Sequence, residues 1–131
     1  MSEENVEAVR RAHEHFRRTG KPLAEIYAPN AKWTTAREDP DSDTYIGLGE
    51  IERLFDSWTA MFPGLGIESD EYRPSGDKVL AWVRLTGTGS GSGAAVDMEQ
   101  AQVWTFEGGK AVSVEEYLHR AEALEAAGLS E

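Results

Sequence analysis

The chain has 131 residues, of which 40% are hydrophobic and 28% charged, and its formal net charge is −11. This length and composition predict one soluble globular domain. The acidic balance argues against a nucleic-acid or anionic-membrane partner, because both require a basic face. The lack of cysteine excludes disulfides, thiolate catalysis and cysteine-ligated zinc.

Targeting signals are not apparent in the sequence. It has neither a basic segment that leads into an apolar run nor a stretch approaching about 18 consecutive apolar residues. Secretion by a signal peptide and membrane spanning are therefore not predicted, and we expect a cytoplasmic protein.

The N-terminal region is predicted to be helical. Residues at helical spacing form one buried stripe: Val6, Val9, His13 and Phe16. This stripe predicts a helix over 3–18 that Gly20 ends. Pro22 suits the first position of a short second helix, which Pro29 ends in turn.

The next segment is predicted to run from strand to loop to helix. Residues 31–36 alternate around Trp33 and predict a short strand, whereas 37–45 is acidic and rich in turn residues. A longer helix should follow, ending at Pro63. Its apolar face consists of Leu48, Ile51, Leu54, Phe55, Trp58, Met61 and Phe62.

The second half of the chain has period-two patterning. It predicts four strands, at 66–73, 78–88, 95–106 and 110–117. Short turns link them, which is typical of an antiparallel meander. The pattern then returns to helical spacing from Leu118, with Gly128 as the C-cap. Helices first and strands later is an α+β order.

Four segments carry a resemblance to a known family: ENVEAVRRAHEHFRRTG, LAEIYAPNAKW, YIGLGEIERLFDSW and QVWTFEGGKAVSVEEYLHRAEALEAAGL. In order and spacing they resemble SnoaL-like and nuclear transport factor 2-like proteins, over essentially the whole of 1–131. The resemblance implies a single cone-like α+β domain, in which a curved antiparallel sheet wraps around a long helix and N-terminal helices close a pocket. It also implies a homodimer formed through the convex face of the sheet.

This family does not have one function. It includes ketosteroid isomerases, polyketide cyclases, dehydratases, epoxide hydrolases and binding modules without activity, so the fold alone selects none of them. The function has to be argued from the side chains that would line the pocket.

His13 is a candidate catalytic residue. Its spacing places it on the buried stripe of the first helix. Counted back from Gly20, it falls where the ketosteroid isomerases that this helix resembles carry a tyrosine that donates to an oxyanion. A histidine can donate the same hydrogen bond or act as an acid or base near neutral pH. The alternative is a histidine that is hydrogen-bonded to a neighbour in the pocket wall.

Gln102 is the second candidate catalytic residue. Counted back from the Gly-Lys turn, it lies where those isomerases place a carboxylic acid. An amide can donate a hydrogen bond to an oxygen, but it cannot donate a proton. Thr35, near the place of the isomerases' catalytic carboxylate, has no basicity. Ketosteroid isomerisation by the familiar route is therefore not expected.

Other residues are candidates for ligand contact. Alternation along the strand 95–106 directs Gln100 and Gln102 to the same face as Met98 and Trp104. The full set of candidate ligand contacts is Trp33, Trp58, Met98, Gln100, Trp104, Glu116 and Tyr117. Aromatic residues at these spacings are also typical of an ordinary core.

Neither a metal nor a cofactor is predicted. His13 and His15 face away from each other on a helix and cannot chelate one ion. Four acidic residues have the spacing of a calcium loop: Asp39, Asp41, Asp43 and Glu50. Thr44 stands where that loop requires glycine, so we interpret 37–44 as a solvated acidic loop that could cover the cavity mouth. The glycine-rich segment 87–93 lacks phosphate-loop residues and predicts a flexible hairpin.

Three functions stay open on the sequence. The first is a dimeric protein that binds a small apolar or aromatic ligand, with His13, Gln100 and Gln102 as polar contacts. The second is a cofactor-independent isomerase, cyclase, dehydratase or hydrolase, in which His13 is the acid or base and Gln102 polarises an oxygen. The third is an interaction module that uses the convex sheet.

Overall fold

The computed structural model describes residues 2–91 and 93–130, with all of their side chains except those of Ser2 and Asp70. The helices are α1 (Ser2–Thr19), the 3-10 turn η1 (Ala24–Ile26), α2 (Leu48–Met61) and α3 (Arg120–Ala127). The strands are β1 (Tyr27–Thr34), β2 (Thr44–Ile46), β3 (Gly66–Ser75), β4 (Lys78–Thr88), β5 (Ala95–Glu107) and β6 (Lys110–Tyr117). None of the described helices is long and apolar enough to cross a membrane.

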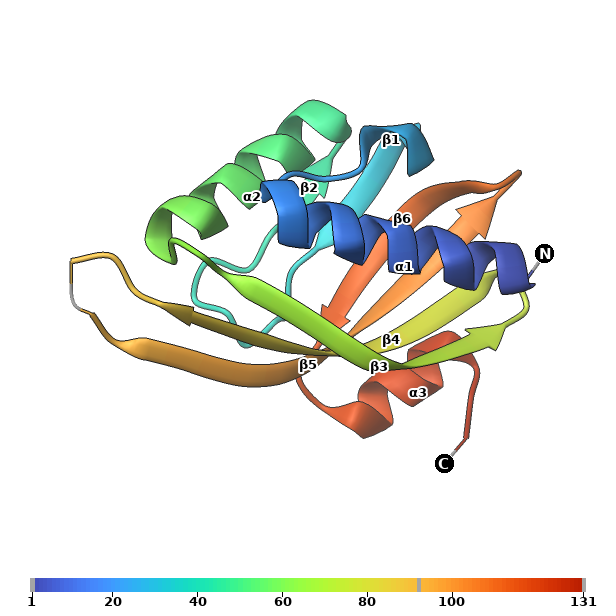
Figure 1. Cartoon of the computed structure of the whole chain (residues 1–131). Helices are drawn as coiled ribbons and strands as arrows, with labels where there is room; N and C mark the ends of the chain where they lie inside the picture. Colours follow the sequence, from blue (N-terminus) through green and yellow to red (C-terminus); the bar gives the residue numbers. More distant parts are fainter. Residues whose placement is uncertain (1, 92, 131) are drawn as a thin grey trace.

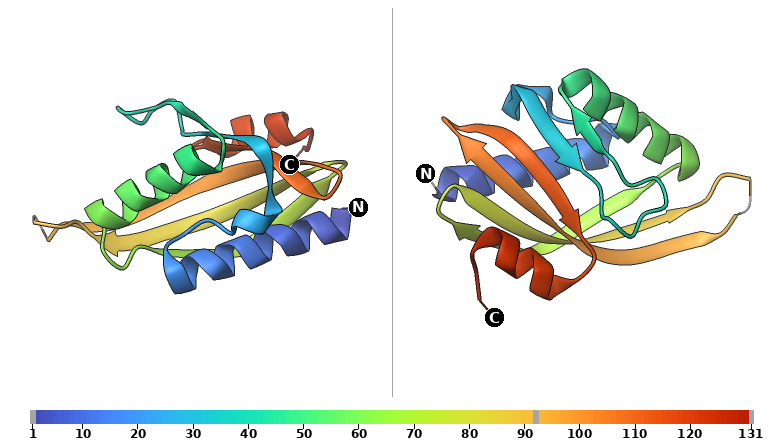
Figure 2. Two further views of the ribbon diagram at one scale, coloured as in Figure 1. Left: turned by 90° about the horizontal axis from the view of Figure 1, so that it is seen from above. Right: turned by 180° about the vertical axis from the view of Figure 1, so that it is seen from behind.

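One curved sheet organises the molecule (Figure 1). Its six strands have the order β2-β1-β6-β5-β4-β3. Helices α1 and α2 lie on the concave face, and α3 lies on the opposite face, as the two further views make clear (Figure 2). The α+β architecture predicted from the sequence, a curved sheet with N-terminal helices on one side, is therefore confirmed.

Strand β4 shows how the sheet is buried on both faces. Val79 and Val83 point into the core between the sheet and helices α1 and α2, whereas Leu80, between them, points to the other face. There it packs beneath Leu124 of α3. Two-sided burial explains why VLAWV is continuously apolar, since four of its five residues are buried and Trp82 is partly buried. On the concave side, α1 is held close to β3 and β4, and α2 close to β1 and β2.

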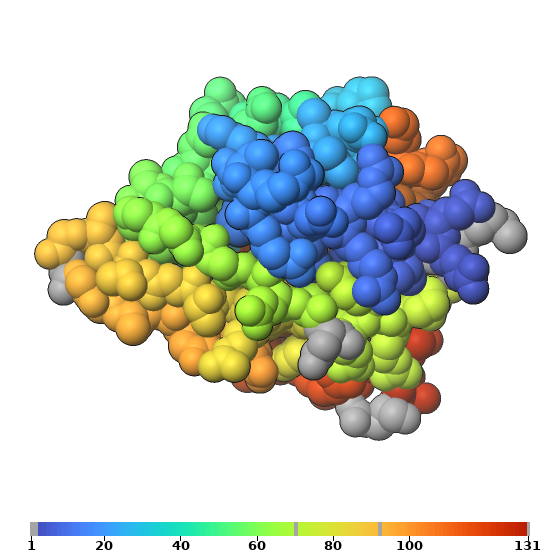
Figure 3. Space-filling view, in the orientation of Figure 1, coloured from blue at the N-terminus to red at the C-terminus, as the bar shows by residue number. Residues whose placement is uncertain are grey.

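The turn after α1 brings that helix beside α2. Gly20 has φ +72, a left-handed conformation that favours glycine, and its N–H donates to the Phe16 carbonyl. A side chain at this position would approach the Thr59 side chain of α2 to 3.1 Å. In the space-filling view, atoms of α1 and α2 lie side by side on the upper part of this face, above atoms of the strands (Figure 3).

The predicted strands of the second half agree with the observed ones to within two residues, but the first half differs in three ways. The predicted loop 37–45 contains the start of β2, a strand too short to show an alternation pattern. The predicted second helix is only the 3-10 turn η1, and β1 begins at Tyr27 instead of residue 31. A register shift between Tyr27 and Lys32 accommodates Pro29, which has no N–H to donate.

The third difference corrects the prediction of an all-antiparallel sheet. Strands β3 to β6 form the predicted antiparallel meander, but β1 pairs with β6 in parallel, with Trp33 opposite Val114. The sheet is therefore mixed. Strands β1 and β6 are separated by most of the chain, so no turn signal in the sequence could reveal their relative direction.

Candidate functional site

A cavity of about 380 Å³ lies between α1, α2 and the concave face of the sheet. Its volume falls in the range of about 300 to 1,000 Å³ that is typical of small-molecule sites. Most of the wall is apolar. The aromatic residues that line it are Phe16, Tyr27, Trp33, Phe55, Trp58, Phe62 and Trp104.

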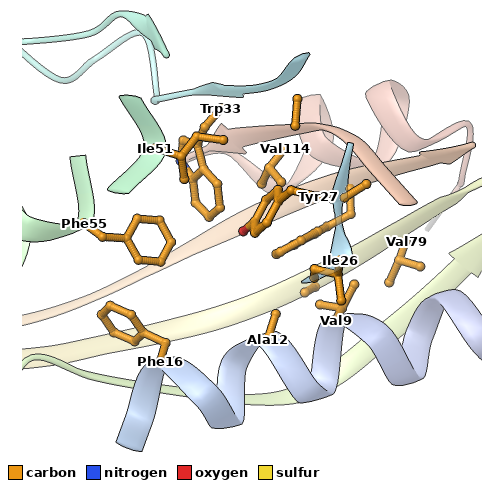
Figure 4. Close-up of a cluster of buried hydrophobic side chains, with 14 of the residues drawn as sticks. Val9, Ala12, Phe16, Ile26, Tyr27, Trp33, Ile51, Phe55, Val79 and Val114 are labelled. Atoms are coloured by element: carbon orange, nitrogen blue, oxygen red, sulfur yellow. The ribbon is translucent and has the colours of Figure 1, made fainter. Parts of the chain in front are cut away.

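The aromatic side chains come from different elements and meet across the cavity (Figure 4). Phe16 of α1 and Phe55 of α2 face each other edge to face, with ring centroids 5.5 Å apart. Phe55 also contacts Trp33 of β1 at 5.2 Å and Trp58 of its own helix at 5.0 Å. The helices and the sheet are thus joined by aromatic contacts around an apolar space.

His13 is held in a hydrogen-bonded network whose proton positions can be deduced. The indole Nε1–H of Trp104 is only a donor, so the atom that it contacts at 3.0 Å must be the Gln102 oxygen Oε1. The same oxygen lies 2.8 Å from His13 Nε2, which must therefore carry a proton. The Tyr72 hydroxyl could donate or accept, and burial decides between the two, because it keeps the imidazole neutral near pH 7. His13 Nδ1, 2.9 Å from this hydroxyl, is then the acceptor of the tyrosine proton.

The electrostatics of His13 agree with this assignment. Its side chain is 3% exposed, and burial is the main reason that its pKa falls from 6.5 to about 4, opposed by the Gln102 hydrogen bond. The nearby positive charge of Arg17 also lowers the pKa. Both ring nitrogens are occupied within the protein, and the neutral form persists well below pH 7. Because Gln102 uses its oxygen for two bonds, its NH2 group is the part left for the cavity.

Glu116 is a second polar group in the wall, and burial raises its pKa, whereas burial lowers the pKa of His13. Its carboxyl oxygen Oε2 accepts a hydrogen bond from Trp33 Nε1 at 2.8 Å, and the side chain is 8% exposed. Burial raises the pKa of this carboxyl from 4.5 to about 7. The opposing influences are the hydrogen bond from Trp33, the backbone N–H of Ala36 and the side chain of Gln100. Near neutral pH, Glu116 is therefore balanced between its neutral and its charged form.

The acidic loop forms part of the cavity wall. Glu38 and Asp39 line the cavity beside Ala36, and the loop is fastened to the start of α3 by two contacts. Glu38 lies 3.2 Å from His119 Nε2, and Arg37 pairs with Glu122. That the loop covers the cavity mouth stays a prediction. The contacts of Arg37 and Glu38 with the start of α3 hold the loop in place.

Glu38, His119 and Glu122 are also a group of the described residues whose ligand atoms lie within 4.8 Å of one another, as a metal would require. They are largely exposed, and Arg37 contacts both carboxylates. Since a guanidinium already compensates these charges, we assign no metal to the group. In the calcium-like series, Asp39 Oδ1, Asp43 Oδ1 and Glu50 Oε1 accept backbone N–H groups of the loop and of β2.

Most candidate residues from the sequence meet at the cavity. Eight of the nine line it: His13, Trp33, Trp58, Met98, Gln100, Gln102, Trp104 and Glu116. Tyr117 does not, because it follows Glu116 on a strand and therefore faces the other side, where it packs near α3. Thr35 is buried, and its hydroxyl bonds to the backbone of Asp43 instead of facing the cavity.

Tyr72 is a site residue that the sequence pattern did not reveal. A β-bulge between Ser69 and Glu71 reverses the alternation of β3, so that Tyr72 shares the concave face with Ile67. Simple alternation would have directed it outward. The signal was therefore hidden by one inserted residue, which no period-two pattern can register.

The site and the fold can now be compared with known proteins. Residues 6–114 match the sequence model of the SnoaL-like domain. The chain belongs to the SnoaL-like domain family. No curated protein sequence matches this SnoaL-like chain.

Solved structures share its fold. Bal32a, from a soil-derived mobile gene cassette, superposes with a TM-score of 0.81 and 23% identity, over 95% of this chain and 96% of that one. TerC co-crystallised with polyporic acid has a TM-score of 0.76 and 19% identity, over 95% and 98%. A hypothetical protein with a ketosteroid isomerase-like fold comes from Catenulispora acidiphila DSM 44928 and was crystallised in complex with trimethylamine. It superposes with a TM-score of 0.67 and 15% identity, over 88% of this chain and 90% of that one. At these identities the likeness shows the fold.

Proposed function

We propose that this chain binds a small, largely apolar molecule in the cavity between α1, α2 and the sheet. The observation that carries the proposal is a cavity of about 380 Å³ with an aromatic wall and a few convergent polar groups. This combination is the usual signature of a small-molecule site. Two proteins of the same fold, TerC and the Catenulispora protein, were crystallised with small molecules, which supports the same use of the fold here.

The polar contacts of the ligand are assigned from the hydrogen-bonding atoms that face the cavity and are not already bonded within the protein. The Gln102 NH2 group and the Glu116 carboxyl face the cavity, and Gln100 lies next to Glu116. His13 acts through Gln102, because its own ring nitrogens are already bonded. Met98, 38% exposed, lines the cavity where it approaches solvent.

The proposal is tested by titration with N-phenyl-1-naphthylamine, an uncharged probe whose fluorescence rises in apolar surroundings. We expect saturable binding to the folded protein. The variant Leu85→Trp, which adds bulk at the cavity wall, should reduce the affinity by about tenfold or more. Thr86→Trp places the same ring at the next, exposed position of β4 and should leave binding unchanged. Equal binding by both variants would place the probe outside the cavity.

One observation favours catalysis as a second candidate function. The pKa of Glu116 near 7 is suited to moving a proton at neutral pH, whereas that of His13 near 4 is not. An enzyme in this cavity would therefore use Glu116 as its acid or base. Deuterium incorporation into the enolisable ketone 2-tetralone, followed by NMR, tests this: Glu116→Gln should abolish any exchange that the native chain accelerates. If the native chain does not accelerate the exchange, catalysis on enolisable ketones is excluded as a function.

Two further expectations remain proposals. A homodimer through the convex sheet would have to use the area that α3 leaves uncovered, which includes the exposed Arg84–Asp97 ion pair. Sedimentation velocity of the native chain and of Arg84→Glu tests this arrangement, since a charge reversal at the contact should shift a dimer toward monomer. An interaction module that uses this face without a ligand is the alternative if no small molecule binds.

A further inference from the structure

The carboxyl group of Glu116 has no counter-ion among the residues that the structure describes. It is more than nine-tenths buried, and none of the ion pairs among the described residues includes it. The charge that most affects it is that of Asp39, which is also negative. Buried carboxylates are normally paired, because removing an unpaired charge from water is costly. The described part of the chain therefore supplies no partner of opposite charge for this carboxyl group.

The charges around the cavity have one sign. Among the described residues that line it, the charged side chains are Glu38, Asp39 and Glu116, without a lysine or an arginine. His13 adds no positive charge near pH 7, because burial lowers its pKa to about 4. Glu38 is partly compensated by Arg37, whereas none of the ion pairs among the described residues includes Glu116 or Asp39. The carboxyl groups of this wall would repel an anionic ligand and attract a cation.

The rings next to Glu116 supply a second feature that favours a cation. Trp33, which donates to Glu116, lies 5.7 Å from Trp58 and 5.2 Å from Phe55, measured between ring centroids. All three rings line the cavity. The faces of aromatic rings attract ammonium groups, and the attraction is strongest where water is excluded. A carboxyl group beside several aromatic rings is therefore suited to hold an amine cation.

We propose that the ligand of this cavity is an apolar molecule that carries a protonated amine. Its ammonium group pairs with Glu116 and lies against the rings of Trp33, Phe55 and Trp58, and its apolar part fills the remainder of the cavity. This inference rests on the proposed function, since it names the chemical class of the molecule bound there. It distinguishes amines from neutral alcohols or ketones and from carboxylates of the same shape.

The test uses three probes that share one skeleton: 1-naphthylmethylamine, 1-naphthylmethanol and 1-naphthoate. Their affinities for the full chain are measured by isothermal titration calorimetry at about pH 8, where Glu116 is mostly charged. We expect the amine to bind about tenfold or more tightly than the alcohol, and the carboxylate to bind most weakly. An alcohol that binds as tightly as the amine overturns the proposal.

Variants of Glu116 assign the preference to one group. Glu116→Gln should lower amine affinity by about tenfold or more and change alcohol affinity by less than about twofold. Glu115→Gln is the matched control, because it removes the same charge one residue earlier on β6 and should keep the preference. Glu116→Asp, which retains the charge on a shorter side chain, should keep part of it. Circular dichroism verifies the fold of each variant, and an amine preference that survives Glu116→Gln overturns the assignment.

A pH series provides an independent readout. The amine probe stays protonated between about pH 6 and pH 8, so a change in its affinity reports the ionisation of Glu116, whose pKa lies near 7. Amine affinity should rise with pH over this interval, and alcohol affinity should not. Asp39 and Tyr45 are titratable groups that interact with Glu116, and Glu38 and His13 line the same cavity. A pH response that persists in Glu116→Gln would assign it to them and contradict the proposal.

The outcomes separate this inference from the function on which it rests. If N-phenyl-1-naphthylamine enters the cavity but the three naphthyl probes show no preference for the amine, the cavity binds small molecules and only the amine proposal fails. If neither that neutral probe nor any of the three binds, both fail together.

Discussion

His13 and Glu116 line the same cavity and are both buried, but they differ in how completely the protein supplies partners for them. His13 gains a complete set of partners, Gln102 and Tyr72, and remains neutral. Glu116 gains hydrogen-bond donors but no opposite charge from the described residues, and its pKa lies near neutral pH. The comparison shows that a closed network builds the wall, whereas an incomplete one is where a ligand can contribute.

The largest effect should come from breaking the closed network. Gln102→Leu leaves the His13 and Trp104 N–H groups without their acceptor, and two buried unsatisfied donors should lower the free energy of unfolding by about 4 kcal/mol. Gln100→Leu, the same change on the same face of β5, removes one group beside Glu116 and should cost about 1 kcal/mol. Urea unfolding at neutral pH measures both. Equal losses would show that the His13 network is no more complete than the Glu116 site.

The pH dependence of stability should separate the two groups next. The pKa of Glu116 is about 7 in the fold against an ordinary 4.5, so the unfolded chain releases its proton first as pH rises. Glu116 therefore removes about 3 kcal/mol of stability between about pH 4.5 and 7. The pKa of His13 is about 4 against 6.5, so the unfolded chain takes up its proton first as pH falls. His13 removes about 3 kcal/mol between about pH 6.5 and 4.

In the native chain these two contributions nearly cancel over the interval that they share. Replacing one of the two groups should therefore reveal the pH dependence of stability that the other group causes. His13→Gln, whose amide can keep both hydrogen bonds, should lose stability as pH rises toward 7, and Glu116→Gln should gain it, each by about 1.4 kcal/mol per pH unit. Denaturant midpoints measured at about pH 5 and about pH 6.5 give the two slopes. Parallel slopes in both variants would contradict the assignment of opposite protonation behaviour.

A matched pair of tryptophan changes gives a smaller effect. Trp33→Phe removes the donor to Glu116, and Trp104→Phe removes a donor to Gln102, with the same loss of ring size. A hydrogen bond to a charged acceptor is worth about 1 kcal/mol more than one to a neutral acceptor. The cost of Trp33→Phe should therefore be about 1 kcal/mol greater at pH 8 than at pH 5, whereas the cost of Trp104→Phe should not change. Equal pH dependence in the two variants would speak against a charge on Glu116.

The sequence was sufficient for most of the fold and for much of the cavity wall. Period-two patterning placed β3 to β6 within two residues, because long strands repeat the signal many times. The same alternation put Gln100, Gln102 and Trp104 on one face, and the structure has them there. Helical spacing likewise placed His13 on a buried face. These predictions rest on local geometry, which the sequence carries directly.

What the sequence could not provide depends on which distant groups meet. No local pattern shows that β1 pairs in parallel with β6 or that Trp33 donates to Glu116 across that pair. The chemical contrast between His13 and Glu116 is equally non-local, since it arises from how many partners each group finds in the folded chain. Tyr117 was predicted to line the cavity together with Glu116, but neighbouring residues on a strand face opposite sides, and Tyr117 packs near α3.

Tyr72 gives the smallest effect and the most direct test of the deduced tautomer. Its hydroxyl donates to His13 Nδ1, so Tyr72→Phe should cost about 1 kcal/mol in the native chain. In the His13→Leu background, where no acceptor remains, the same change should cost almost nothing, and the double-mutant cycle gives the pairwise energy. In NMR spectra, the imidazole nitrogens of the native chain should show a proton on Nε2 alone. A proton on Nδ1, or additive costs in the cycle, would contradict the network that sets His13 apart from Glu116.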